Sequence, residues 1–390
     1  MAKIVFFCIP AHGHTNPTLP VVQALTAAGH EVIYYSYASF RGEIEAAGAR
    51  FMPCDDTGAG PAAADGAAVA RDITVAAELI SQVTLAMDAE VTRQLEALRP
   101  DVIVSDSVAF WGKLFARKLG IPYVCSCTTF AFNQYSSRIM KQSFGDLLRM
   151  LVKLPRTGRL LKPLRDRGYP AKNIMSIIQN DNDTPTVVYT SPEFQPCADT
   201  FSDRYTFVGP CIRPAEAKPE KPERPLVYIS MGTVIQREAD FYRRCAEAFS
   251  DGQYEVVISA GTEADVAALG PLPENIRAYP RVDQIAVLQI ADVFITHCGM
   301  NSVSEALWFS VPLVTRPLTP EESGVANRVI ELGAGLPLEA ADAPAIRAAV
   351  DRARTEPGFR SAAAEISAGF RRCGGPQAAA RAILATADRR

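Results

Sequence analysis

The sequence predicts an α/β fold with parallel sheets in two domains, and three observations carry this prediction. Short apolar runs of strand type alternate with segments whose apolar residues recur at helical spacing, the pattern of a parallel sheet covered by helices. The chain has 390 residues, more than one hydrophobic core normally supports. Residues 213–225 are rich in proline and charge and lack apolar periodicity, as expected for a linker.

The strand-like runs can be followed in order along both halves of the chain. They are KIVFFCI (3–9), EVIYYSY (31–37), DVIVSD (101–106), PYVCSC (122–127), TVVYT (186–190), LVYIS (226–230), EVVIS (255–259), VFIT (293–296) and PLVT (312–315). The last stretch reads as a helix, a GGP break and another helix. We therefore expect an N-terminal domain over 1–212, the linker 213–225, a C-terminal domain over 226–373 and a final helix over 374–390, with a ligand between two facing sheets.

Composition narrows the class of protein. Hydrophobic residues make up 48% and charged residues 21%, as in ordinary globular enzymes. A net charge of -3 without a basic, aromatic-interleaved patch gives no reason to expect nucleic acid. Nine cysteines without paired spacing argue against a disulfide framework. The apolar run Ile4–Ile9 is too short for a signal peptide and no segment has the length of a membrane span, so we expect a cytoplasmic protein without stable membrane insertion. The oligomeric state is unknown from the sequence.

The most informative motif is THCGMNSVSEAL at residues 296–307. An apolar run precedes it and helix formers follow it, which predicts a strand-to-helix turn. The first amides of a helix are unpaired and lie at the positive end of its dipole, so such a turn binds anions. His297, Asn301 and Ser302 add donors, and Glu305 can accept from sugar or ribose hydroxyls.

An alternative interpretation needs no ligand. Ser302 followed three residues later by Glu305 fits a capping box, in which the two side chains satisfy amides at the start of a helix. This interpretation leaves His297, Gly299 and Asn301 unexplained. We therefore favour the anion site.

A second motif lies near the N-terminus. His12 and His14, two of only four histidines, stand after the first strand, and Asn16 with Pro17 suits the start of a helix. Asp106 ends another predicted strand, so in one parallel sheet it lies on the same edge as His14. An imidazole oriented by a carboxylate forms a general base that can deprotonate a hydroxyl. The alternatives are a helix N-cap for the aspartate and a solvent-exposed loop for the histidine.

Several separated motifs occur in an order that resembles a known family. They are PxxGHxxP (10–17), the strand-end Asp106, SMGT (230–233), HxGxNSxxE (297–305) and VP (311–312). Together they resemble the nucleotide-sugar-dependent glycosyltransferases of family 1, in particular the bacterial macrolide and flavonoid glycosyltransferase-like enzymes. The resemblance implies the GT-B fold, with two facing Rossmann-like domains, parallel sheets, a cleft between them and a last helix that packs back on the first domain.

The resemblance also implies roles for individual residues. His14 matches the catalytic base and Asp106 its partner acid. The matched donor-binding positions are Ser230, Thr233, Arg281, Gln284, His297, Gly299, Asn301, Ser302, Glu305, Glu321 and Glu322. Weaker candidates for contact with the acceptor are His12, Phe110, Trp111 and Phe130.

The implied reaction is inverting transfer of a sugar from a nucleotide diphosphate, foremost UDP-glucose, to a hydroxyl of a hydrophobic natural product such as a macrolide, polyketide or flavonoid. The nucleotide sugar, UDP- or dTDP-linked, is a co-substrate and no cofactor is required. Glucose-using relatives carry an acid followed by glutamine where this chain has Glu321 and Glu322, and Leu318 stands where glutamine is common. A dTDP-deoxysugar transferase of antibiotic biosynthesis therefore stays open.

Other possibilities concern catalysis, metal and membrane. A nucleotide-sugar epimerase or a non-catalytic helper of the same fold would not need the pair of His14 and Asp106. Asp181 and Asp183 precede a strand instead of ending one, so we expect no metal site. The basic segment 133–173 is interpreted as a helical lid over the acceptor pocket, with a membrane-surface helix as the alternative.

Overall fold

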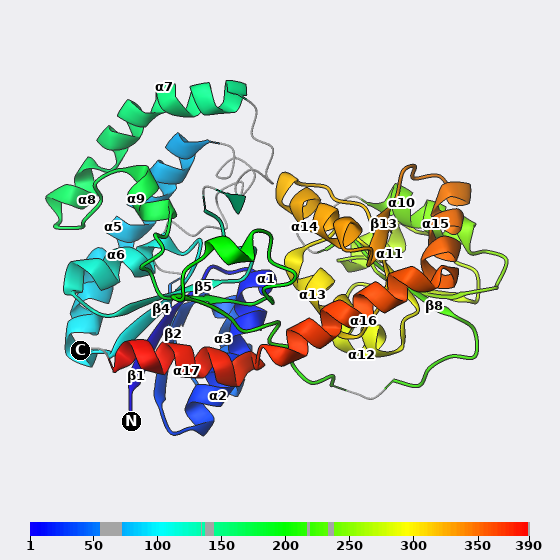
Figure 1. Cartoon of the computed structure of the whole chain (residues 1–390), viewed down its shortest axis with the longest axis horizontal. Helices are drawn as coiled ribbons and strands as arrows, with labels where there is room; N and C mark the ends of the chain where they lie inside the picture. Colours follow the sequence, from blue (N-terminus) through cyan, green and yellow to red (C-terminus); the bar gives the residue numbers. More distant parts are fainter. Residues whose placement is uncertain (55–71, 134, 137–143, 217–218, 233–237, 389–390) are drawn as a thin grey trace. The chain divides into compact units, whose positions relative to one another are not determined.

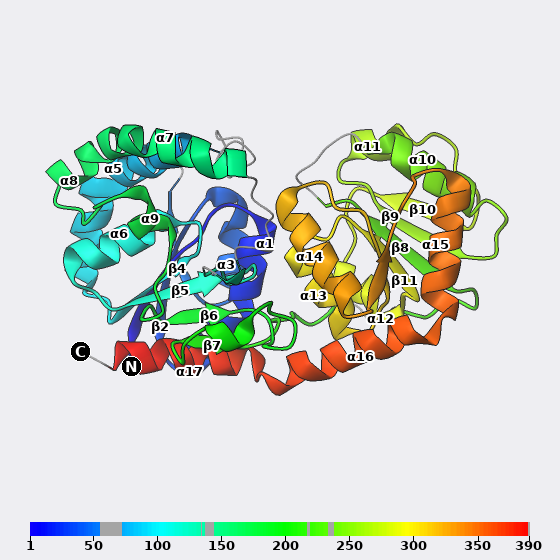
Figure 2. The same cartoon turned by 45° about the horizontal axis from the view of Figure 1, so that its top comes forward.

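The computed structural model describes residues 1–54, 72–133, 135–136, 144–216, 219–232 and 238–388. The chain divides into two compact units, one made of Met1–Cys211 with Cys373–Arg390 and the other of Ile212–Arg372. Each unit holds one parallel sheet (Figures 1 and 2). The predicted α/β fold with two parallel sheets is confirmed.

The first unit contains a seven-stranded sheet in the order β3-β2-β1-β4-β5-β6-β7. Its strands are β1 (Lys3–Phe7), β2 (Glu31–Ser36), β3 (Arg50–Pro53), β4 (Val102–Asp106), β5 (Tyr123–Cys127), β6 (Thr186–Val188) and β7 (Tyr205–Phe207). Its helices are α1 (His12–Thr15), η1 (Asn16–Thr18), α2 (Leu19–Ala27), η2 (Ala38–Phe40), α3 (Arg41–Ala46), α5 (Ile73–Leu98), α6 (Phe110–Leu119), α7 (Phe144–Leu160), α8 (Lys162–Asp166), α9 (Ile174–Ile178), η6 (Ala198–Thr200) and α17 (Gly375–Ala387).

Helices cover both faces of this sheet. Val5 and Phe7 of β1 point into a core with α5 and α6, whereas Ile4 and Phe6 point into a second core with α2 and α17. Successive strand residues face opposite sides, so an unbroken apolar run such as KIVFF fills two cores at once. The sequence run therefore explains why the strand is central and buried.

The second unit contains a six-stranded sheet in the order β10-β9-β8-β11-β12-β13. Its strands are β8 (Leu226–Ser230), β9 (Glu255–Ser259), β10 (Ile276–Tyr279), β11 (Val293–Thr296), β12 (Leu313–Thr315) and β13 (Gly335–Pro337). Its helices are α10 (Ala239–Ala248), α11 (Glu263–Ala267), α12 (Gln284–Ile290), α13 (Met300–Trp308), α14 (Pro320–Glu331), α15 (Ala343–Thr355) and α16 (Pro357–Arg372).

The final helix and the proline-rich segment have definite partners. Helix α17 lies against α2 of the first unit, and the amide of Gly375 donates to the Val208 carbonyl over 2.8 Å. The described residues of the proline-rich segment, 213–216 and 219–225, fall within the second compact unit. The Arg213 guanidinium lies 2.6 Å from the Asp283 carboxylate.

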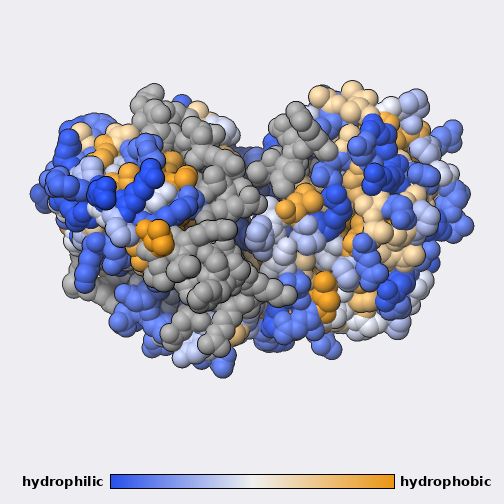
Figure 3. All heavy atoms as spheres, turned by 90° about the horizontal axis from the view of Figure 1, so that it is seen from above, coloured by the Kyte–Doolittle hydropathy of each residue, from blue (hydrophilic) through white to orange (hydrophobic). Residues whose placement is uncertain are grey.

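The basic helix α7 packs along α5 (Figure 1). Within the described residues, no helix is both long enough and apolar enough to cross a membrane. On the face drawn in Figure 3, hydrophobic residues form separate spots among hydrophilic ones.

Candidate active site

His14 and Asp106 meet at the carboxyl edge of the first sheet. His14 Nδ1 lies 2.8 Å from Asp106 Oδ2, because β1 and β4 are adjacent parallel strands and both residues follow or end them. The side chain of His14 is 19% exposed and that of Asp106 only 1%. The ring is therefore open to a ligand while the carboxylate is not.

The hydrogen bonds of Asp106 decide which ring nitrogen can act. Its Oδ1 accepts from the Val108 amide over 3.0 Å, which fixes the carboxylate, and its Oδ2 faces Nδ1 of His14. A carboxylate only accepts hydrogen bonds, so Nδ1 carries the proton. Nε2 then carries the lone pair that a general base requires.

Apart from His14, the titratable side chains around Asp106 are cysteines and tyrosines that burial keeps neutral. Burial raises the pKa values of the Cys8 and Cys127 thiols and of the Tyr189 phenol, and the Asp106 carboxylate raises them further. Burial also raises the pKa of Cys125 to about 11. These groups are neutral near pH 7, so the negative charge beside His14 comes from Asp106.

The helix that contains His14 begins earlier than the sequence predicted. Helix α1 begins at His12 with Ala11 as its N-cap, and Asn16 with Pro17 lies further on in a continuing 3-10 turn. Asn16 therefore does not cap this helix. The helical run begins earlier because no proline interrupts it before position 17, and a proline is tolerated in the first turns of a helix.

The predicted acceptor contacts need correction. Trp111 is 3% and Phe130 5% exposed, so both are buried in the core, and the Phe130 ring lies 5.6 Å from that of Phe194. Phe110 is half-buried against the same core as Trp111. His12 is also partly open, with its ring edge against Phe40.

Three apolar side chains that follow Asp106 or β5 in the chain are exposed. Val108 is 38%, Phe132 40% and Tyr135 48% exposed. They follow Asp106 and strand β5 closely in the chain. Gln195 holds their segment by accepting from the Ala131 amide and donating back to the Ala131 carbonyl. In the sequence, the feature that marks these side chains is their position shortly after a strand end.

In the second unit, His297 lies on the turn between β11 and α13, as predicted. Its ring is pressed between two glycines. A Cβ atom on either Gly232 or Gly299 would come within 2.7 Å of Nε2. Gly232 also has φ of +82°, which only glycine adopts without strain.

The electrostatics of His297 favour a neutral ring. Burial lowers its pKa, and the charge of the Glu322 carboxylate opposes this only in part. Within the described part of the chain, its buried Nδ1 makes no hydrogen bond with a side chain or backbone group of good geometry. An unsatisfied buried polar atom at a helix N-terminus fits a site that takes a ligand.

The capping-box interpretation of Ser302 and Glu305 is wrong. Helix α13 begins at Met300 with Gly299 as its N-cap, so Ser302 lies inside the first turn. Glu305 instead accepts from Gln284 Nε2 over 2.6 Å.

These side chains form a network that the sequence did not show. The amide of Asn301 also donates to Glu305, over 3.1 Å, and Gln284 donates to Ser302 Oγ over 3.2 Å. Burial raises the pKa of Glu305 to about 7, against the lowering effect of Gln284. Four of the predicted donor-site residues are thus connected by hydrogen bonds at the start of α13: Gln284, Asn301, Ser302 and Glu305.

One carboxylate oxygen of Glu322 is engaged by the backbone. Its Oε2 accepts from the amides of Leu318 and Thr319 over 2.7 and 2.9 Å, which makes it the capping partner at the start of α14. The expectation that both adjacent glutamates touch a sugar stays a prediction. Glu321 is exposed beside it.

Of the remaining predicted donor-site residues, those that the structure describes lie at strand and helix ends of the second unit. Ser230 ends β8 and is buried, and Arg281 is exposed before α12. Thr233 lies outside the described residues. Asp283, whose meaning the sequence did not show, accepts from Arg213 and from the Glu216 amide and so ties the proline-rich segment to α12.

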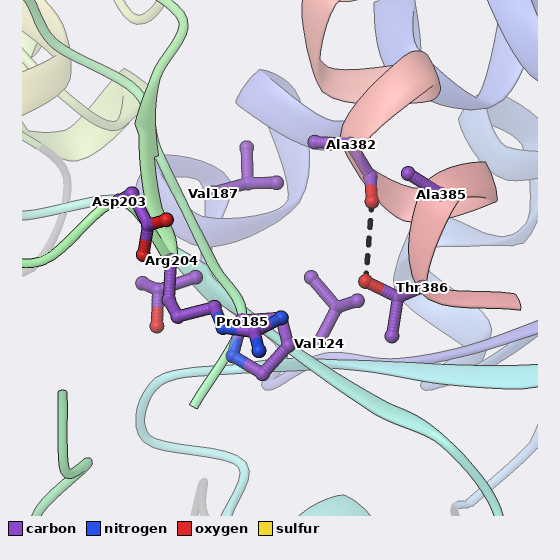
Figure 4. Close-up of a pocket in the computed structure, with 9 residues that line it drawn as sticks. Val124, Pro185, Val187, Asp203, Arg204, Ala382, Ala385 and Thr386 are labelled. Carbon is purple, nitrogen blue, oxygen red and sulfur yellow. Dashed lines mark hydrogen bonds between the residues drawn. The ribbon is translucent and has the colours of Figure 1, made fainter. Parts of the chain in front are cut away.

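Two hollows of the first unit lie away from His14 and Asp106. Both are lined by Pro185 and Thr386, at the amino ends of the strands, whereas His14 stands at their carboxyl ends. The smaller, of about 60 Å³, is drawn in Figure 4, where the Thr386 hydroxyl donates to the Ala382 carbonyl. The larger, of about 590 Å³, is lined also by Asp181 and Asp183. No group of three metal-ligating side chains occurs among the described residues.

Known proteins are similar to this chain in sequence and structure over nearly its whole length. Residues 245–385 match a family model described as Erythromycin biosynthesis protein CIII-like, C-terminal domain. The chain is 33% identical to NDP-glycosyltransferase YjiC of Bacillus licheniformis, over 98% of this chain and 97% of that protein. It is 32% identical to demethyllactenocin mycarosyltransferase of Streptomyces fradiae, over 98% and 86%. The crystal structure of CalG4, the calicheamicin glycosyltransferase, aligns with a TM-score of 0.83 and 29% identity, covering 100% of this chain and 99% of that chain.

Two parallel-sheet units, together with the similarity to known glycosyltransferases over nearly the whole chain, define a glycosyltransferase of the GT-B class that uses a nucleotide sugar and a small-molecule acceptor. The chain belongs to family 1 of the GT-B glycosyltransferases, with the bacterial macrolide and antibiotic glycosyltransferases among its relatives.

Proposed function

We propose that this enzyme transfers a sugar with inversion from a nucleotide diphosphate to a hydroxyl of a hydrophobic natural product. The observation that carries the proposal is the 2.8 Å contact between His14 and Asp106, with a buried carboxylate and a partly exposed ring. His14 Nε2 takes the proton of the acceptor hydroxyl while that oxygen attacks the anomeric carbon. Asp106 stabilises the imidazolium that forms.

The second unit is proposed to hold the donor. The amides at the start of α13, Ser302 and the buried His297 would stabilise the negative charge on the departing diphosphate. Glu305, held by two amide donors, would accept from the ribose hydroxyls. A neutral ring at His297 acts here as a hydrogen-bond donor, and the helix dipole supplies part of the positive potential.

The acceptor is proposed to be apolar. Apolar surface is exposed at Val108, Phe132 and Tyr135. Val108 lies two residues after Asp106, and the other two residues follow β5. Burying that surface would contribute about 25 cal/mol per Å² of apolar area. A macrolide, polyketide or flavonoid has the apolar surface to do so.

For the sugar, UDP-glucose is our first candidate. A dTDP-deoxysugar is the second, because Glu322 is already used by two amides and Leu318 offers no polar side chain to a sugar hydroxyl. Fewer free acceptors suit a sugar with fewer hydroxyls. One relative, demethyllactenocin mycarosyltransferase, is named for a sugar other than glucose.

A mass-spectrometric screen tests the proposal. UDP-glucose, other UDP-sugars and dTDP-deoxysugars are incubated with a panel of phenols, flavonoids and macrolides, using the wild type and the His14→Ala variant. We expect a mass increase of one sugar on an apolar acceptor with the wild type only, and the anomer opposite to that of the donor by NMR. Retention of configuration, or equal transfer by the variant, would overturn the mechanism.

A further inference from the structure

Three neighbouring strands bring a third group to the ring of His14. β1, β4 and β5 are consecutive in the sheet, and Thr128 directly follows β5. Its hydroxyl oxygen lies 3.0 Å from His14 Nδ1, the same nitrogen that Asp106 Oδ2 approaches to 2.8 Å. Two oxygens thus share one ring nitrogen.

Burial makes this contact more than incidental. Thr128 is 5% exposed, and within the described residues the His14 nitrogen is the one hydrogen-bond partner of its hydroxyl. A buried hydroxyl without a partner costs free energy, so the contact stabilises the fold as well as the ring. Nδ1 carries a single proton, and the charged carboxylate is the stronger acceptor. The hydroxyl oxygen of Thr128 is left to accept a weaker share of the same N–H.

We propose that Thr128 is a positioning residue that, with Asp106, holds the ring of His14 in the tautomer and orientation needed to deprotonate the acceptor. This inference rests on the proposed function of His14. One acceptor would let the ring swing about a single hydrogen bond. Two acceptors from different strands fix the direction of the N–H and therefore the direction of the Nε2 lone pair.

The proton balance assigns Thr128 no chemical step of its own. The acceptor O–H bond breaks, its proton passes to Nε2 of His14, and its oxygen bonds to the anomeric carbon as the bond to the diphosphate breaks. The Nδ1 proton stays between Asp106 and Thr128 throughout. In the imidazolium the Nδ1–H is a stronger donor, so both oxygens stabilise the charged ring more than the neutral one.

The titratable groups that face this cluster do not compete with it. Cys8 follows β1, Tyr123, Cys125 and Cys127 lie on β5, and Tyr189 follows β6; burial raises the pKa of each. They stay neutral near pH 7. The difference between the pH profiles of the wild type and a Thr128 variant therefore reports on His14 with its two oxygen partners, because Glu305 is the same in both.

The test compares Thr128→Val, which removes the hydroxyl at constant size, with Thr128→Ser, which keeps it. We expect kcat to fall about threefold to tenfold in Thr128→Val, with an unchanged KM for the nucleotide sugar, and to return to within about twofold in Thr128→Ser. The acidic limb of the kcat/KM profile should move to lower pH in Thr128→Val, because the imidazolium loses one acceptor. Thr129→Val, one residue along, is the matched control and should behave like the wild type.

A spectroscopic readout separates positioning from mere packing. With only four histidines, the ring nitrogens of His14 can be assigned by ¹⁵N NMR with the help of His14→Ala. We expect Nδ1 to be protonated in all three proteins because Asp106 remains, and the Nδ1–H signal to shift in Thr128→Val but not in Thr128→Ser because the valine removes one of its two acceptors. An unchanged Nδ1–H signal together with an unchanged pH profile in Thr128→Val would overturn the inference, even if its activity fell.

Two further results keep the outcomes distinct. If Thr128→Val does not fold, Thr128→Ala removes the same hydroxyl without adding a methyl group and takes the same measurements. If His14→Ala transfers sugar as fast as the wild type, the proposed function fails and not only the role of Thr128. The tautomer of His14 can still be measured in that case.

Discussion

Gln284 and Glu305 are joined across two helices of the second unit. The amide Nε2 of Gln284, at the first position of α12, donates to Oε2 of Glu305 on α13 over 2.6 Å. The hydroxyl of Tyr228 in turn donates to the amide oxygen of Gln284 over 3.0 Å. The glutamine is therefore fixed at both ends and offers its N–H to a carboxyl whose pKa burial raises to about 7.

Glu305→Gln should remove a pH dependence of stability. The pKa of Glu305 is about 7 in the folded chain, against 4.5 as its ordinary value, so folding favours the protonated form. Stability of the ligand-free wild type should fall by on the order of 2 kcal/mol as the pH rises from 4.5 to 7, and stay level above. Thermal unfolding at pH 5 and pH 8 measures this. A wild-type fall that persists in Glu305→Gln, or is equally removed by Glu247→Gln on the exposed side of α10, would contradict the assignment.

His14→Ala should abolish catalysis without weakening the donor. A positioned general base contributes about 10²–10⁴-fold, so kcat should fall within that range. Affinity for the nucleotide diphosphate, measured by calorimetry, should stay the same because the proposed donor residues lie in the other unit. His30→Ala is the control, since its ring accepts from the Ala2 amide on the opposite edge of the sheet. Substantial transfer by His14→Ala would refute the role.

Gly232→Ala should disturb the ring of His297. The new Cβ would come within 2.7 Å of Nε2, at a φ of +82° that alanine adopts only with strain. We expect a loss of stability on the order of 2 kcal/mol and weaker binding of the nucleotide diphosphate. Gly270→Ala provides the comparison, because its φ of +70° is as strained while nothing lies within 4 Å of its Cβ. Equal nucleotide affinity in the two variants would show that contact with His297 is not what matters.

Asp88→Asn should destabilise the first unit. This buried carboxylate on α5 accepts from Lys118, Tyr169 and Arg167. Burial by itself would raise its pKa, but the hydrogen bonds and charge of Lys118 and the hydrogen bond of Tyr169 outweigh burial and lower it. Breaking a buried pair in this way costs about 3 kcal/mol.

The pH dependence of the Asp88 effect has a definite sign. A lowered carboxyl pKa stabilises the fold above the ordinary value of 3.8, and this contribution is lost as the pH falls through the folded value. Chemical denaturation of wild type and Asp88→Asn should therefore converge in acid. Asp166→Asn, which breaks an exposed pair with Lys162, should cost less than about 0.5 kcal/mol at any pH. A similar loss in both variants would contradict the buried network.

The strands divide into those that the sequence predicts and those that it does not. The nine apolar runs all form strands. The four strands without such runs are β3, β7, β10 and β13, and each lies at an edge of its sheet. An edge strand is short and partly exposed, so its residues need not be apolar on both faces. Its hydrogen bonds come from a neighbour that is distant in the chain, and this partner is not visible in a local pattern.

The site divides in the same way. Sequence motifs determined that His14 and His297 follow strands and that Asp106 ends one, because a strand end followed by a helix start can be recognised locally. Contacts between elements were decided only by the tertiary structure. It placed Thr128 against the ring of His14, made Glu305 a partner of Gln284 instead of a cap, and buried Trp111 and Phe130.

Local order and three-dimensional packing are different kinds of information, and this explains the division. A strand, a turn or a helix start depends on residues within about one or two turns of chain, and the sequence records those directly. The partner of a side chain depends on strand order and on the competition of nearby donors and acceptors. Glu322 shows what a local pattern leaves out. The sequence allows both adjacent glutamates to contact a sugar, whereas in the structure the amides of Leu318 and Thr319 already donate to one oxygen of Glu322 and so cap α14.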